Sequence, residues 1–162
     1  MPSAWMEIDE GDPGIRQILA NLSCLKDYYG TLPCIRRASL CIAGSRIDND
    51  QQGHVNRLAD FVRRAVIYQA DPYNLEFTQT PDVMLLEINR RGFVTGDCDD
   101  HCLLFSSLCE SLGVACEIVG VMIDSPMWNH VICVAYPDDT PLEIDLCAKS
   151  GQNPHYVQQL RI

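Results

Sequence analysis

The hydrophobic period of the sequence changes near residue 113, and this change most limits the folds open to the chain. Before it, apolar residues recur every three or four positions, which is typical of amphipathic helices. After it, residues 114–123, 130–136 and 142–147 alternate with a period of two, which is typical of strands. Helices followed by a group of strands predict the α+β class with a small antiparallel sheet.

Five helical segments are expected before the strands. The segment 33–48 fits a short helix or a strand, and the helix is favoured. Residues 69–81 have no clean period, and a long loop inside a compact domain is often functional. Glycines follow several of the helical segments, as glycine commonly does at helix ends. The expected helices span residues 14–29, 33–48, 54–68, 81–92 and 97–113.

A chain of 162 residues predicts one domain, spanning 1–162. No internal repeat or low-complexity tract divides it. The polar start, residues 1–13, is expected to be a loose arm, and residues 14–92 a helical leader. Residues 93–150 form the expected core of the domain, and residues 151–162 a C-terminal tail.

The charge of the chain excludes two general classes of partner. Its 22 acidic and 12 basic residues give a net charge of -10, whereas a phosphate-binding surface needs an excess of lysine and arginine. Nucleic acid and anionic membrane are therefore not expected, although a local basic patch at Arg36, Arg37 and Arg46 stays open. No apolar run approaches the roughly 20 residues of a membrane-spanning helix.

Nine cysteines are many for a chain of this length. A secreted disulfide scaffold would begin with an apolar signal segment, but the start of this chain is acidic and polar. The odd number would also leave one thiol without a partner. We therefore expect a reducing, cytoplasmic compartment and mostly buried, unpaired cysteines.

Cys98 differs from the other cysteines because it lies at the expected start of a helix, next to the N-cap residue Asp97. Helix N-termini stabilise a thiolate, which is the nucleophilic form of cysteine. The adjacent Asp97, Asp99 and Asp100 would instead raise the thiol pKa. A reactive Cys98 therefore needs a base.

His130 is the best candidate base, and Asp145 the best candidate to orient it. His130 begins one expected strand and Asp145 lies on the next, so adjacent antiparallel strands can bring them together. A carboxylate that binds one ring nitrogen leaves the other free to take a proton from the thiol. Cys98, His130 and Asp145 thus form a predicted triad for nucleophilic attack.

The motifs GDCDD, NHVICV and LEIDLC occur in the order that resembles the transglutaminase-like superfamily, which has a papain-like fold. The resemblance covers about residues 81–147 and implies that Cys98, His130 and Asp145 are catalytic. Its members include cysteine proteases, amide hydrolases and acyltransferases that form a thioester without a cofactor, so a protein or peptide substrate is expected. The chain lacks the extra domains and calcium loop of eukaryotic transglutaminases, so hydrolysis and amine transfer both stay open.

The upstream segment FVRRAVIYQADPYNLEFTQTP resembles phage and prophage members of that superfamily. This narrower likeness implies a phage protein in the host cytoplasm or the virion, with a virion or assembly partner. A non-catalytic assembly protein that retains the fold is therefore the alternative function.

Further site residues are predicted around Cys98. The backbone N–H of Cys98 would supply one donor of an oxyanion hole, and Gln79 or Gln69 the second, with Gln79 preferred. Trp128, two residues before His130, would wall the site.

A metal site at Cys98, His101 and Cys102 is a third possibility. One helix rarely directs positions i, i+3 and i+4 at a single ion, and the chain has no CxxC pair. No metal is expected.

Overall fold

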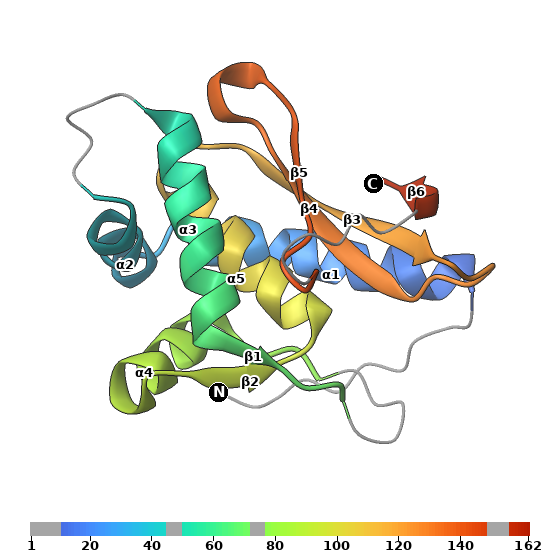
Figure 1. Ribbon diagram of the computed structural model, residues 1–162, viewed down its shortest axis with the longest axis horizontal. Coiled ribbons are helices and arrows are strands. Elements are labelled where there is room, and N and C mark those ends of the chain that lie inside the picture. The colour runs from blue at the N-terminus through green and yellow to red at the C-terminus, as the bar shows by residue number, and fades with distance from the viewer. Residues whose placement is uncertain (1–10, 45–49, 72–76, 149–155) are drawn as a thin grey trace.

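The computed structural model describes residues 11–44, 50–71, 77–148 and 156–162. Five helices precede most of the strands, and four strands form an antiparallel sheet, so the predicted α+β class is confirmed. Figure 1 shows the sheet on one side of a central helix, with the remaining helices around the other sides.

All five predicted helices are present, with shifted ends. The first begins at Asp12, inside the predicted arm, and has Pro13 in its first turn, where proline is well tolerated. The third begins earlier than predicted because Asp50 caps it by accepting from the Gly53 N–H at 2.7 Å. The helices are α1 (Asp12–Gly30), α2 (Pro33–Ala43), α3 (Gln51–Ala65), α4 (Pro81–Arg91) and α5 (Cys98–Ser111).

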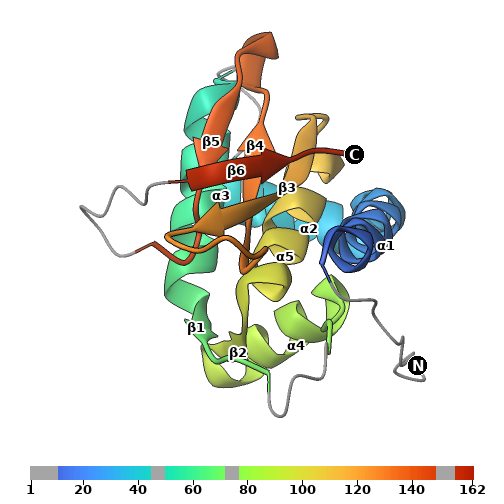
Figure 2. The same cartoon turned by 90° about the vertical axis from the view of Figure 1, so that its right-hand side faces the viewer.

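The main sheet has the order β5-β4-β3-β6, and all its pairs are antiparallel. Three of its strands were predicted. The fourth, β6, lies within the segment expected to be a tail and pairs with β3 across the sheet (Figure 2). The strands are β3 (Cys116–Ile123), β4 (His130–Ala135), β5 (Leu142–Ile144) and β6 (Tyr156–Leu160), with a 3₁₀ turn, η3 (Pro137–Asp139), between β4 and β5.

A second, two-stranded sheet was not predicted. Strands β1 (Val66–Tyr68) and β2 (Val94–Gly96) pair in parallel, with Tyr68 opposite Gly96. The third helix was predicted to continue to residue 68. In the structure it ends at Ala65, and β1 begins at the next residue, Val66. This pair matters for the site because β2 leads directly into Asp97 and α5.

Helix α5 is the centre of the molecule. It packs against α1, α2, α3, α4 and strands β3 and β4 (Figures 1 and 2). Its buried residues are not confined to one apolar stripe, since Leu103, Leu104, Ser106 and Ser107 are buried as well as Cys102, Phe105 and Leu108. A helix enclosed on all sides is held rigidly, so it provides a fixed base for the residues at its N-terminus.

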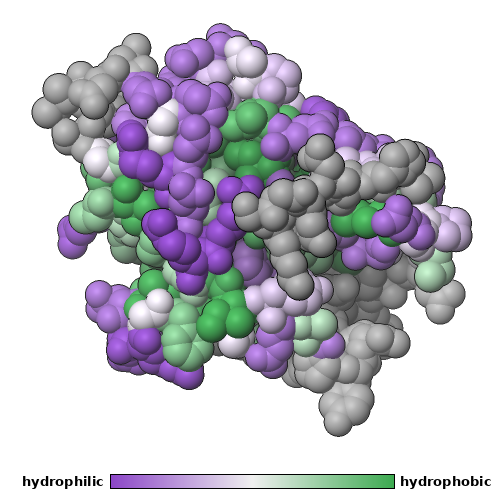
Figure 3. Space-filling model, in the orientation of Figure 1, coloured by the Kyte–Doolittle hydropathy of each residue, from purple (hydrophilic) through white to green (hydrophobic). Residues whose placement is uncertain are grey.

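The face of the molecule in Figure 3 is largely hydrophilic. Figure 3 shows polar side chains over most of one face, with apolar groups over β1 and α4 near its lower edge. The exposed apolar residues on these two elements include Ile67, Val83 and Leu86. None of the helices in the described residues is both long and apolar enough to cross a membrane.

Candidate active site

Cys98 is the first residue of α5, and Asp97 is its N-cap, as predicted. The backbone N–H groups in the first turn of a helix have no partner within the helix. The Cys98 thiol therefore lies beside donors that can stabilise negative charge, in the position that the sequence indicated.

His130 and Asp145 are brought together by the pairing of β4 with β5. In the register, Cys133 lies opposite Ile144, so continuing it by one residue places Asp145 opposite Ile132. His130 precedes Ile132 by two residues and therefore lies on the same face of the sheet. The distance from His130 Nε2 to Asp145 Oδ1 is 3.0 Å, and the side chains are only 11% and 9% exposed.

This contact sets the tautomer of His130. Burial by itself raises the pKa of Asp145, but the hydrogen bond and charge of His130 and the Cys147 and Ala148 N–H groups lower it below its usual value. Both N–H groups donate to Oδ1, at 3.0 and 3.1 Å. An ionised carboxylate only accepts hydrogen bonds, so Nε2 carries a hydrogen, and Nδ1 is the nitrogen with the lone pair whenever the imidazole is neutral.

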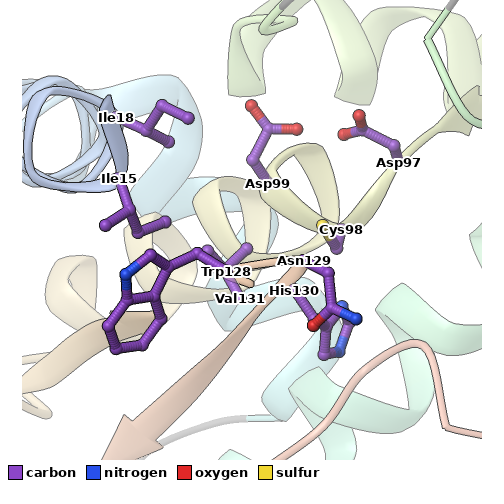
Figure 4. Close-up of a pocket in the computed structure, with 9 residues that line it drawn as sticks. All are labelled: Ile15, Ile18, Asp97, Cys98, Asp99, Trp128, Asn129, His130 and Val131. Carbon is purple, nitrogen blue, oxygen red and sulfur yellow. The ribbon is translucent and has the colours of Figure 1, made fainter. Parts of the chain in front are cut away.

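Cys98 and His130 line the same pocket, which has a volume of about 140 Å³. Figure 4 shows Cys98 at the start of α5 with His130 beside it and two carboxylates from the same helix terminus above. Apolar groups from α1 and Trp128 close the other side. The pocket is lined by Ile15, Ile18, Asp97, Cys98, Asp99, Trp128, Asn129, His130 and Val131.

The surroundings of Cys98 favour the neutral thiol. Burial raises its pKa well above the usual value, and the charges of Asp97, Cys102 and Asp99 raise it further, whereas the Val131 N–H lowers it. The sequence left open whether the helix terminus or the carboxylates would prevail. In the structure burial and the carboxylates prevail, so the thiol does not lose its proton without a base.

Three carboxylates gather at this helix terminus, with one oxygen of each within 4.8 Å of the others. Burial, followed by a hydrogen bond with Asp99 and its charge, raises the pKa of Asp97 to about 8. Burial raises the pKa of Asp100 to about 7 against the hydrogen bonds from Gln79. At neutral pH Asp97 and Asp100 therefore hold protons for part of the time, and the cluster carries fewer than three negative charges.

Oxygen donors of this kind suit a hard cation such as Ca²⁺. Here both oxygens of Asp99 accept hydrogen bonds, from the Asp100 N–H and the Thr78 hydroxyl. Both oxygens of Asp100 also accept, from the backbone N–H and side-chain amide of Gln79. An ion would have to displace these contacts.

Gln79, the preferred second oxyanion donor, has a different position from the one predicted. Its amide Nε2 donates to Thr95 O at 2.7 Å and to Asp100 Oδ2 at 2.9 Å, so both amide hydrogens are engaged. Gln79 is not among the residues that line the pocket. It instead connects the segment before α4 to β2 and to the start of α5.

Gln69 does not line the pocket either, and its side chain is exposed. Its backbone N–H extends the β1–β2 pairing by donating to Gly96 O at 2.9 Å. Trp128 does line the pocket, as predicted, and its Nε1–H donates to Asp12 Oδ1 at 2.5 Å. That bond fixes the indole as a wall, because its only donor points to α1.

The residues considered for a metal are not arranged around one point. The ring nitrogens of His101 contact Asp97 O and Val66 O, at 2.5 and 3.2 Å, which ties α5 to β1. The Cys102 thiol donates to Val131 O at 3.5 Å. His101 and Cys102 therefore serve the packing of α5 and are absent from the lining of the pocket.

Two residues that support the site were not predicted. The Tyr156 hydroxyl, from β6, donates to Asp145 Oδ2 at 3.3 Å. Asn129 closes the turn before His130, since its amide accepts from the Ile123 N–H at 2.8 Å and donates to Ile123 O at 3.0 Å. The position of Asn129 directly before the candidate base could have indicated its role from the sequence. Nothing in the sequence connected Tyr156 to Asp145.

A solved structure described as a "putative protease" from Parabacteroides distasonis ATCC 8503 resembles this chain, with a TM-score of 0.59 and 12% sequence identity. The match covers 78% of this chain and 26% of that chain, so this protein spans about a quarter of the length of its neighbour. A "putative cysteine protease" from Cytophaga hutchinsonii matches with a TM-score of 0.47 and 16% identity, over 69% of this chain and 36% of that one.

Scans against protein-family models and against curated protein sequences find no match. The first structural neighbour is described as a protein of Parabacteroides distasonis and not of a phage, so the phage likeness of the upstream segment has no support. At this low identity the first neighbour establishes the fold alone. The protein therefore has an α+β fold that is shared with a solved structure described as a protease.

Proposed function

We propose that the protein is a cysteine-dependent amide or peptide hydrolase in which Cys98 is the nucleophile, His130 the base and Asp145 the group that orients His130. The observation that carries the proposal is the 3.0 Å contact of His130 with Asp145 beside a pocket that Cys98 also lines. A buried histidine with one nitrogen bound to a carboxylate can accept a proton on the other. The motif resemblance to the transglutaminase-like superfamily supports the same three roles.

The reaction starts from a neutral thiol, because the pKa of Cys98 is raised by burial and acidic neighbours. Cys98 Sγ attacks the substrate carbonyl carbon while its proton moves to Nδ1 of His130. The carbonyl oxygen becomes an oxyanion next to the Cys98 backbone N–H. His130 then protonates the leaving amine, the C–N bond breaks, and a thioester on Cys98 remains.

Water completes the cycle. His130 takes a proton from a water molecule, the resulting hydroxide attacks the thioester carbonyl, and the thiol leaves with the proton of His130. An amine in place of water would give acyl transfer by the same steps. We propose water as the ordinary acceptor because the protease description of the first structural neighbour agrees with hydrolysis.

The test is the rate at which each cysteine reacts with a peptide vinyl sulfone, measured by peptide mass spectrometry over a range of pH. Such a probe needs a nucleophile whose proton is removed during attack. We expect Cys98 to react fastest in the wild type and His130→Ala to slow it by about 100-fold or more. Exposed Cys24, Cys34 and Cys41 serve as internal references that should not change.

Two outcomes would contradict the proposal. One is a Cys98 rate equal to that of the exposed cysteines, and the other is a Cys98 rate that does not depend on His130. Either would favour the alternative, a protein that keeps the fold and acts by binding. Iodoacetamide gives a further check, because its reaction with Cys98 should be slow at neutral pH and rise in alkali, as the raised thiol pKa requires.

A further inference from the structure

The pocket beside Cys98 has two chemically different ends. Ile15 and Ile18 of α1 and the ring of Trp128 form an apolar side, and the carboxylates of Asp97 and Asp99 lie across from them (Figure 4). Its volume of about 140 Å³ is below the roughly 300–1,000 Å³ of sites that enclose a whole drug-sized ligand. The pocket therefore fits one amino-acid side chain.

The acidic end has unused capacity to accept a hydrogen bond. Asp97 Oδ1 is buried and has no hydrogen-bond partner in the described part of the chain. Figure 4 shows the carboxylates of Asp97 and Asp99 facing one another, and Asp99 is only 4% exposed. A cationic donor that reaches these carboxylates would form charge-assisted hydrogen bonds, which are the strong kind.

The surroundings of this pair are acidic as well. The charge of Asp71 also raises the pKa of Asp97, and exposed Asp12 lies at the apolar end, where it holds Trp128. No lysine or arginine forms an ion pair with Asp97 within the described residues. A positive group that enters the pocket would therefore not compete with a lysine or arginine of these residues for Asp97.

We propose that this pocket binds a lysine or arginine side chain of the substrate next to the scissile bond, with its stem against Ile15, Ile18 and Trp128 and its tip beside Asp97 and Asp99. The proposal rests on the proposed function, since it places the pocket beside the reacting thiol. Long basic side chains combine an apolar stem with a charged tip, which is the combination that these two ends require. The Trp128 ring adds attraction for a cation that passes its face.

The test measures binding without catalysis. The full chain would carry Cys98→Ala, which prevents reaction, and Trp5→Phe, which leaves Trp128 as the single tryptophan. The probes are acetyl-Gly-X-Gly amides in which X is lysine, arginine, norleucine or glutamate, titrated against Trp128 fluorescence. Norleucine is the matched control because it keeps an unbranched apolar stem and lacks the charge.

We expect lysine and arginine peptides to bind about tenfold or more tightly than norleucine, and the glutamate peptide to bind least. In the same background, Asp97→Asn should remove the preference for lysine and leave the norleucine affinity unchanged. Asparagine is as good an N-cap as aspartate, so α5 should persist. Ile18→Ala should instead weaken lysine and norleucine peptides alike.

Equal affinity for lysine and norleucine would overturn the proposal, as would a lysine preference that survives Asp97→Asn. A response to calcium chloride without any response to the lysine peptide would also overturn it and point to an ion site. Because these titrations use an inactive variant, they can fail while the vinyl sulfone test succeeds, or succeed while it fails. The two proposals are therefore tested separately.

Discussion

Asp145 accepts a hydrogen bond from His130 on one carboxylate oxygen, at 3.0 Å, and from Tyr156 on the other, at 3.3 Å. His130 begins β4, Asp145 directly follows β5, and Tyr156 begins β6, and β5 and β6 are the two edge strands of the sheet. The carboxylate that contacts the candidate base is therefore held by contacts from more than two neighbouring strands.

Asp145→Asn should lower the vinyl sulfone reactivity of Cys98 by about 100-fold or more without unfolding the protein. Asparagine is nearly isosteric, but it carries no charge to stabilise the imidazolium and can bind the wrong ring nitrogen. The measurement is the Cys98 rate in the peptide mass spectrometry assay. Tyr156→Phe is the matched control, and its effect should be much smaller because it leaves the His130 contact in place. Equal losses in both variants would contradict the role of Asp145.

Gln79→Ala should destabilise the protein by roughly 1–3 kcal/mol, because it removes the side-chain donor to the Thr95 carbonyl and one of the two donors to the buried Asp100 Oδ2, the other being the Asp97 N–H. The measurement is the free energy of unfolding in urea. Gln69→Ala is the matched control, since the Gln69 side chain is exposed, and its effect should stay within roughly 0.5 kcal/mol. A larger effect at Gln69 than at Gln79 would contradict this assignment.

Gly96→Ala should disturb the start of α5 more than the same change at an exposed glycine. An added Cβ at Gly96 would lie 2.5 Å from Asp100 Oδ2 and 2.8 Å from Asp100 Cβ, so the carboxylate would have to move from its partners. We expect a lower free energy of unfolding together with slower reaction of Cys98. Full stability and full reactivity in Gly96→Ala would show that the close approach is not needed.

The stability of the protein should fall as the pH rises from about 4 to about 8. Unfolded aspartate titrates near 3.8, whereas burial raises the pKa of Asp97 to about 8 and that of Asp100 to about 7. Between these values the folded state holds more protons than the unfolded state, so the free energy of unfolding decreases with pH. The slope for one proton is at most roughly 1.4 kcal/mol per pH unit, reduced by solvent exposure.

Urea unfolding at several pH values measures this slope, and Asp97→Asn should make it shallower because one of the two titrating groups is removed. An unchanged slope in Asp97→Asn would exclude Asp97 as a source. Asp145 has the opposite effect, since its lowered pKa gives stability that is lost as the pH falls below 3.8. Asp97→Asn should leave this loss of stability below pH 3.8 unchanged.

Much of the architecture could be predicted because it depends on local pattern. Helical periodicity and terminal residues located all five helices, and alternation located β3, β4 and β5. Strands β1, β2 and β6 were missed, whereas β5, as short as β1 and β2, was located because it lies within the alternating segment 142–147. The missed strands form through pairing with distant segments, which periodicity does not report.

The sequence by itself determined which residues have suitable chemistry at the site: a cysteine at a helix N-terminus, a histidine that begins a strand, and an aspartate just past the next one. Only the tertiary structure decided what surrounds them. It buried Cys98 among carboxylates, placed Tyr156 on Asp145 and used both amide hydrogens of Gln79 within the fold. Burial and hydrogen-bond partners come from segments far apart in the chain, and they set pKa values and tautomers that residue type alone leaves open.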